Sequence, residues 1–87
     1  MKRLKSLSAA SGETIKVTNK WAAEAESRGT TVSGSAWEFS GSATFGSVAL
    51  SGTTATCLLT PTCSGCLTNT VTLASGEVLK AVRQIES

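Results

Sequence analysis

Three cysteines, Cys57, Cys63 and Cys66, are the side chains most suited to chemistry, and the last two form a Cys-Ser-Gly-Cys motif. Three thiolates could bind zinc, but a closed zinc site needs a fourth ligand, and the chain has neither a second such motif nor histidines. A redox motif of this spacing would open a helix, whereas this one follows Pro61 between threonine-rich segments. We interpret Cys57 as a small core residue and the other two as loop thiols. A Cys63–Cys66 disulfide and a cytosolic cysteine-based metal or redox module are the alternatives.

Acid–base chemistry has few candidate groups, because the sequence contains no histidine and no aspartate. Without histidine, neither a Ser-His-Asp nor a Cys-His arrangement can form. The six glutamates lie next to turns or termini, or at positions that alternate toward solvent, and a paired-carboxylate mechanism needs two of them facing each other across a cleft. We therefore expect a non-enzymatic protein, with no catalytic, cofactor-binding or metal-binding residues and no cofactor.

The elements that position these groups belong to a chain of 87 residues, which is enough for one small domain. Serine, threonine and glycine supply 13, 13 and 8 of them, a composition typical of strands joined by tight turns. Charged residues make up 16% of the chain and its mean hydropathy is +0.10, which argues against disorder. The composition predicts an all-β fold.

No apolar run approaches the ~20 residues that a membrane-spanning helix needs. The basic residues at the start are followed by a serine- and alanine-rich stretch (residues 6–13) and not by the apolar segment of a signal peptide. Three cysteines, an odd number, also argue against a secreted disulfide framework. We expect synthesis in the cytosol and no membrane partner.

Alternation and turn signals divide the chain into an N-terminal arm (1–12) and a domain (13–87). Residues 13–19 alternate as a strand, and a short helical turn follows Trp21 and stops at Gly29. The rest forms segments of ten to thirteen residues, four of which close with Ser-Gly pairs at 40–41, 51–52, 64–65 and 75–76. We expect positive φ at these glycines, and Gly46 could mark a β-bulge.

The predicted strands each present one apolar face, which is what a thin two-layered core requires. The inward-facing sets are Ala55, Cys57 and Leu59, then Leu67, Val71 and Leu73, and finally Leu79, Ala81 and Ile85. Trp21 and Trp37 are expected in the core. Six such strands predict a small immunoglobulin-like antiparallel β-sandwich with an extended N-terminal arm.

The stretch from Thr31 to Ile85 resembles the small immunoglobulin-like virion proteins of tailed bacteriophages that act as fibre-tail adaptors. The resemblance is carried by SAWEFSG (35–41) with Trp37, by VALSGTTATCLLT (48–60), and by TNTVTLASGEVLKAVRQI (68–85) with its Ser-Gly hairpin turn. The lead-in from Trp21 to Gly29 is also similar to that of the family.

This resemblance implies a non-enzymatic structural protein of the virion, assembled in the host cytoplasm, that links tail or head-tail connector to fibre. The implied partners are other virion structural proteins (portal, adaptor, tail, fibre or capsid subunits). The resemblance also implies that multiple copies of this chain take part in a symmetric assembly. The alternative within the same class is a capsid decoration or cement protein.

The arm carries the candidate partner-binding residues, Lys2, Arg3, Leu4, Lys5 and Leu7. Edge strands of a small sandwich can pair with a strand from a neighbour, and such an arm can supply one. The two leucines would then give specificity, and the three basic residues would set the encounter with an acidic partner. The other interpretation is a frayed, solvated terminus. A net charge of +2 is too small to imply a nucleic-acid partner.

Overall fold

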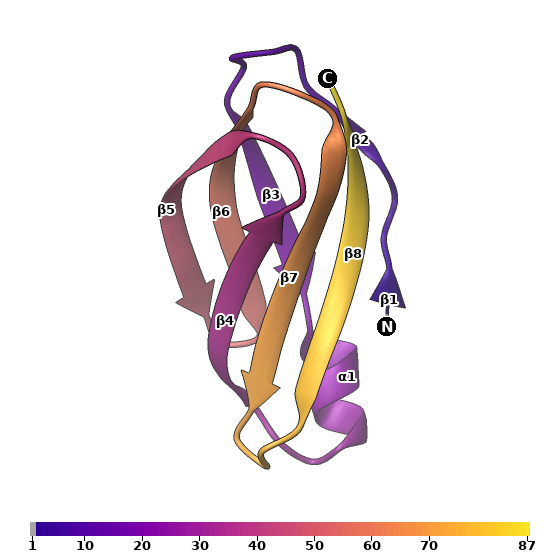
Figure 1. Cartoon of the computed structure of the whole chain (residues 1–87). Helices are drawn as coiled ribbons and strands as arrows, with labels where there is room; N and C mark the ends of the chain where they lie inside the picture. The colour runs from indigo at the N-terminus through magenta and orange to yellow at the C-terminus, as the bar shows by residue number, and fades with distance from the viewer. Residues whose placement is uncertain (1) are drawn as a thin grey trace.

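The computed structural model describes residues 2–87; Met1 of the expected arm and the side chain of Lys2 lie outside the described part. Two β-sheets pack face to face, as expected for a sandwich (Figure 1). The elements are β1 (Lys2–Arg3), β2 (Leu7–Ser8), β3 (Ile15–Lys20), α1 (Ala22–Ser27), β4 (Val32–Phe39), β5 (Ala43–Ser51), β6 (Thr54–Pro61), β7 (Gly65–Leu73) and β8 (Val78–Glu86).

The larger sheet has the order β1-β8-β7-β4, with β2 on the same side of β8 as β1, and the smaller sheet has the order β3-β6-β5. The pairs among β3 to β8 are all antiparallel. Three strands in the order β4-β7-β8 facing three in the order β3-β6-β5 reproduce the C-F-G and B-E-D sheets of immunoglobulin-like domains. The predicted fold class is therefore confirmed.

The core consists of two apolar clusters, stacked along the sandwich, to which strands of both sheets contribute. One is built around Trp21 and the other around Leu59 and Ile85. The predicted inward faces of β6 and β7 are buried, as are Ala81 and Ile85 of β8, whereas Leu79 of that face is only half-buried. Trp21 is 1% exposed. Trp37 was also expected in the core. It packs against both clusters but stays partly exposed, because β4 is the edge strand of its sheet.

The Ser-Gly turns fall into two kinds. Gly52 and Gly76 have φ of +59° and +97°, as predicted for tight turns. Gly41 and Gly65 do not adopt positive φ, so the prediction was wrong there. A Cβ on Gly41 would lie 2.6 Å from Cys63 Sγ, and one on Gly65 would lie 3.0 Å from the backbone nitrogen of Gly41. These two positions need glycine because the chain packs too closely for a side chain.

The predicted bulge at Gly46 is present in β5. Gly46 pairs with Leu58 and Ala49 with Thr56, so β5 advances three residues while β6 advances two. Ser47, inside the bulge, has φ of +45°. The bulge turns Val48 outward, where it is 54% exposed.

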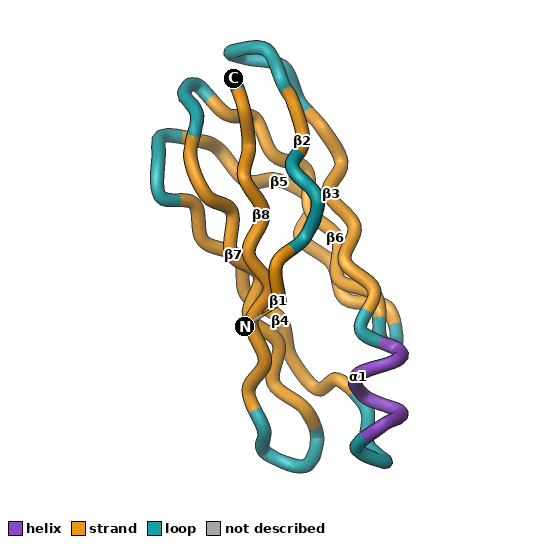
Figure 2. The backbone as a smooth tube through the Cα atoms, turned by 90° about the vertical axis from the view of Figure 1, so that its right-hand side faces the viewer, coloured by secondary structure: helices purple, strands orange, loops and turns teal. Residues whose placement is uncertain are grey.

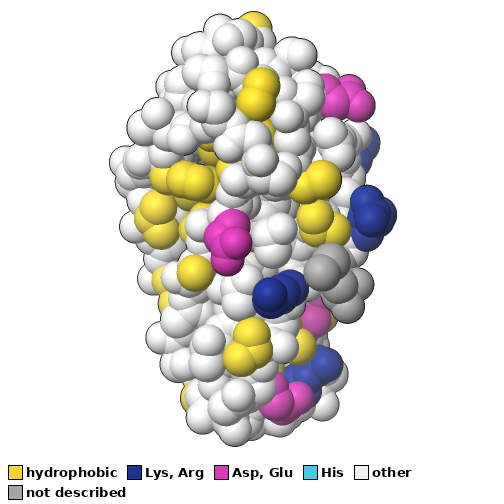
Figure 3. Space-filling model, viewed as in Figure 1, with side chains coloured by type: hydrophobic (Ala, Val, Ile, Leu, Met, Phe, Trp, Pro, Cys, Tyr) yellow, Lys and Arg dark blue, Asp and Glu magenta, His cyan; other side chains and the backbone are white. Residues whose placement is uncertain are grey.

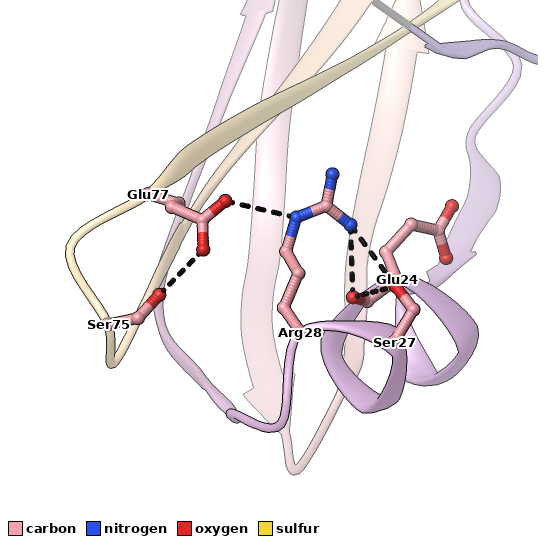
Figure 4. A network of polar contacts seen from close by, with 5 residues as sticks. All are labelled: Glu24, Ser27, Arg28, Ser75 and Glu77. Carbon is pink, nitrogen blue, oxygen red and sulfur yellow. Dashed lines mark hydrogen bonds and ion pairs between the residues drawn. The ribbon is translucent and has the colours of Figure 1, made fainter.

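Helix α1 carries the chain from the smaller sheet to the larger one and ends at Ser27. Gly29, just past this end, has φ of +63°, as predicted for the glycine that stops the helix. Arg28 ties this crossover to the turn between β7 and β8, because its Nε lies 3.1 Å from Glu77 Oε2 (Figure 4). Ser75 Oγ donates to the other oxygen of Glu77 at 3.1 Å. Both charged side chains are at least one-third exposed, so this pair contributes little stability. Within residues 2–87, no helix has the length and apolar character for crossing a bilayer.

Candidate functional site: the N-terminal arm and its groove

The three thiols are all free and do not converge. Cys57 points into the core, where burial raises the pKa of its thiol to about 11. Cys63 is exposed, and its Sγ accepts a hydrogen bond from the Ser42 amide at 3.1 Å. Cys66 instead donates to Gln84 Oε1 at 3.3 Å on β8. Across residues 2–87, no three Cys, Asp or Glu side chains are grouped as metal ligands would be.

The N-terminal arm lies along β8 of its own chain, on the side away from β7 (Figure 2). Lys2 and Arg3 pair in parallel with Ala81 and Val82, and Leu7 and Ser8 pair in parallel with Ile85 and Glu86. The Leu4 amide donates to the Val82 carbonyl and the Ala9 amide to the Glu86 carbonyl, each at 2.8 Å. We call residues 2–9 the seated arm, and the surface along β8 that holds them the groove.

The seated arm bulges away from a regular ladder between its two short strands. From Arg3 to Leu7 the arm advances four residues, whereas β8 advances three residues from Val82 to Ile85. One extra residue is therefore accommodated in the segment 4–6. A bulge of this kind leaves backbone groups that β8 cannot pair, so they need other partners.

Apolar side chains of the seated arm face the sandwich on either side of the bulge. Leu4 packs against the cluster around Trp21, and Leu7 packs against the cluster that contains Ile85. Ala9 is 3% exposed. The arm therefore covers both parts of the core at the open side of the sandwich.

Arg83 holds the bulge from inside the sandwich. It stands on β8 between Ala81 and Ile85, in the alternation that points inward, and is half-buried. Its Nη1 donates to the Lys5 carbonyl at 2.7 Å, and its Nη2 donates to Asn19 Oδ1 at 3.3 Å. Desolvation lowers the pKa of Arg83 from its ordinary value, although an arginine keeps its charge at neutral pH.

A buried hydrogen-bond network connects Arg83 to the far sheet and to the start of the helix. Asn19 Nδ2 donates to Asn69 Oδ1 at 3.2 Å, and the same oxygen accepts from Trp21 Nε1 at 2.9 Å. Asn69 Nδ2 donates to Ser35 Oγ and to the Ala36 carbonyl, both at 3.0 Å. Asn69 is fully buried, so these bonds satisfy groups that water cannot reach.

The basic residues of the arm lie on its outer side. Arg3 and Lys5 are exposed, so their charges are available to a partner while the Lys5 carbonyl points inward to Arg83. On the face drawn in Figure 3, basic and acidic side chains are scattered, with one of each side by side near the lower end, and hydrophobic side chains occur in small separate groups. Of the predicted partner-binding residues, Leu4 and Leu7 contact the core of their own chain, and Lys2 contributes its described backbone to β1.

A turn at residues 10–13 joins the seated arm to β3. The Glu13 amide donates to the Ala10 carbonyl at 2.9 Å, and Gly12 has φ of +83°. The Gly12 amide also donates to the Pro61 carbonyl at 2.9 Å, which fastens the turn to the end of β6. The four residues of the turn are all exposed.

Sequence reasoning missed the residues that anchor the arm. Arg83 and Asn69 stand at alternate positions on the same strand faces as apolar residues that were predicted to point inward. Asn19 continues the alternation of Ile15 and Val17. Because these three side chains are polar, they were not expected in the interior, although their positions in the strands face it. The usable signal was the alternation itself, which continues through each polar residue.

The chain was compared with protein families, curated proteins and solved structures. No protein family, no curated protein and no solved structure matches the chain.

Proposed function

We propose that this chain is a non-enzymatic structural module of a tailed-phage virion, an adaptor that links tail or head-tail connector to fibre through protein–protein contacts. Its immunoglobulin-like sandwich serves as a rigid scaffold, and its N-terminal arm contacts the neighbouring subunit. The virion assignment rests on the motifs around Trp37, in residues 48–60 and in residues 68–85, which resemble fibre-tail adaptors.

The observation that carries the proposal is the seating of the arm at a sheet edge by main-chain bonds. Only four of its residues form ladder pairs, and Arg3 and Lys5 face solvent. A segment held in this way is bound as strand-adding peptides are bound, by backbone hydrogen bonds with a few apolar side chains for specificity. Its exposed positive charges favour encounter with an acidic subunit.

Incorporation into particles tests the proposal. Deletion of residues 1–12 should lower the amount of the protein in purified particles, because the contact segment is lost. That deletion also uncovers the clusters beneath Leu4 and Leu7, so a second variant, Arg3→Glu with Lys5→Glu, reverses the exposed charge and leaves the leucines in place.

The matched control is Lys16→Glu with Lys20→Glu, which makes the same charge change at two exposed residues of β3. We expect lower incorporation for the arm charge variant and normal incorporation for the control. Undiminished incorporation of both the deletion and the arm charge variant would argue against the arm as the contact.

A further inference from the structure

We propose that the groove along β8 also accepts the seated arm of a second copy of this chain, so that neighbouring copies exchange arms. This inference rests on the proposed function, in which the arm contacts a neighbouring subunit, and it adds a second copy of this chain as the place where the arm is seated, with Arg3 and Lys5 still exposed toward an acidic subunit. Identical copies brought together in an assembly are the setting in which such exchange occurs.

The contacts that a second copy's arm would make are those that the seated arm makes within its own chain. Residues 2–9 fill the groove with two parallel ladders, with Leu4 and Leu7 on the two clusters, and with the Lys5 carbonyl on Arg83. The same residues from another copy would make the same contacts. Exchange therefore changes only the turn at residues 10–13, which is why domain swapping is a low-cost route to association.

The turn has the properties of a hinge. Gly12 holds a φ of +83° that other residues adopt at a cost, and the turn residues are exposed. When extended, residues 10–14 reach up to about 17 Å, so the arm can pass to a groove on an adjacent copy. Opening the turn breaks the bonds from the Glu13 amide to the Ala10 carbonyl and from the Gly12 amide to the Pro61 carbonyl, and it lets Gly12 leave its positive φ.

Concentration decides which arm occupies the groove. A chain's own arm is tethered beside its groove, and short tethers give effective concentrations in the millimolar range. The closed form therefore predominates in dilute solution, while neighbouring copies in an assembly present arms at comparable local concentration. Exchange should therefore increase with protein concentration.

Thiol crosslinking between two different variants detects the exchanged arm. Ser8 and Glu86 are register partners and both are exposed, so Ser8→Cys in one chain meets Glu86→Cys in another only when arms are exchanged. Ser replaces Cys63 and Cys66 in both chains, which leaves the buried Cys57. Treating a mixture of the two variants with a short bis-maleimide should give a crosslinked dimer whose yield rises with concentration.

The control mixture pairs Ser8→Cys with Val78→Cys, which is exposed but stands at the other end of β8, about 26 Å away along the strand. It should give no dimer. Gly12→Ala should raise the yield about fivefold, since the hinge strain is relieved on opening. Gly29→Ala, which strains another positive φ outside the arm, should not change it.

Equal dimer yields from the test mixture and the control mixture would overturn the exchange. So would the absence of a dimer at about 1 mM protein, provided that a Ser8→Cys, Glu86→Cys double variant crosslinks within its own chain. Incorporation into particles tests the proposed function independently of this dimer. If that dimer is absent and deletion of residues 1–12 still blocks incorporation into particles, then the arm contacts a different subunit, and only the exchange is wrong.

Discussion

The guanidinium of Arg83 reaches out from between the sheets and donates a 2.7 Å hydrogen bond to the Lys5 carbonyl, at the bulge of the N-terminal arm. Its other terminal nitrogen bonds Asn19 on the opposite sheet. One side chain therefore links the arm, β8 and β3. Because both acceptors are neutral oxygens, the contact depends on geometry and not on an ion pair.

Arg83→Ala should therefore loosen the arm. Loss of the charge-assisted bond and of the packed stem should lower the free energy of unfolding by about 1–3 kcal/mol. Hydrogen exchange should accelerate at the amides of Leu4 and Ala9, which bond β8. The control is Lys80→Ala, an exposed basic residue of the same strand. Unchanged protection of both amides in Arg83→Ala would contradict the role given to this residue.

Asn69→Ala tests the buried network. The substitution leaves Trp21 Nε1 and Asn19 Nδ2 without their shared acceptor in the interior, so we expect a loss of about 2–4 kcal/mol in urea unfolding followed by tryptophan fluorescence. The matched control is Thr70→Ala, one residue along on the outer face, which should cost less than about 1 kcal/mol. Similar losses for the two variants would show that the network adds nothing to ordinary packing.

Much of the sandwich follows from local patterns. The alternation in residues 55–59 and 67–73 sets which face is buried, and Gly29 ends the helix in the conformation that its lack of a Cβ allows. The parallel pairing of the arm with β8 has no comparable signal, since each ladder is two residues long and joins opposite ends of the chain. Long-range pairing of so few residues is decided by packing of Leu4 and Leu7, not by propensity.

Close packing explains another gap between pattern and structure. Gly65 looks like a turn glycine in sequence, but it lies against the Phe39 ring and the backbone of Gly41. Gly65→Ala should lower the free energy of unfolding by about 1–3 kcal/mol, because the added methyl must displace backbone. Gly34→Ala is the control, since a Cβ there meets no atom within 4 Å. Equal urea midpoints for the two variants would contradict this explanation.

The buried thiol of Cys57 makes stability depend on alkaline pH. Burial raises its pKa from the ordinary 9.0 to about 11, so the unfolded chain loses the thiol proton at lower pH than the folded one. Stability should be unaffected below about pH 9 and should fall by about 2 kcal/mol as the pH rises to about 11. The measurement is urea unfolding across this range, with Cys57→Ala as the control that cancels other titrations. Parallel pH curves for the two proteins would exclude the thiol as the cause.

The most direct test of a structural role in the virion is crosslinking mass spectrometry on purified tailed particles with an amine-reactive reagent. We expect the protein to be present in a fixed number of copies per particle, and we expect Lys5, exposed on the arm, to be linked to a neighbouring structural subunit. A protein absent from the particles and recovered only free in the lysate would contradict it.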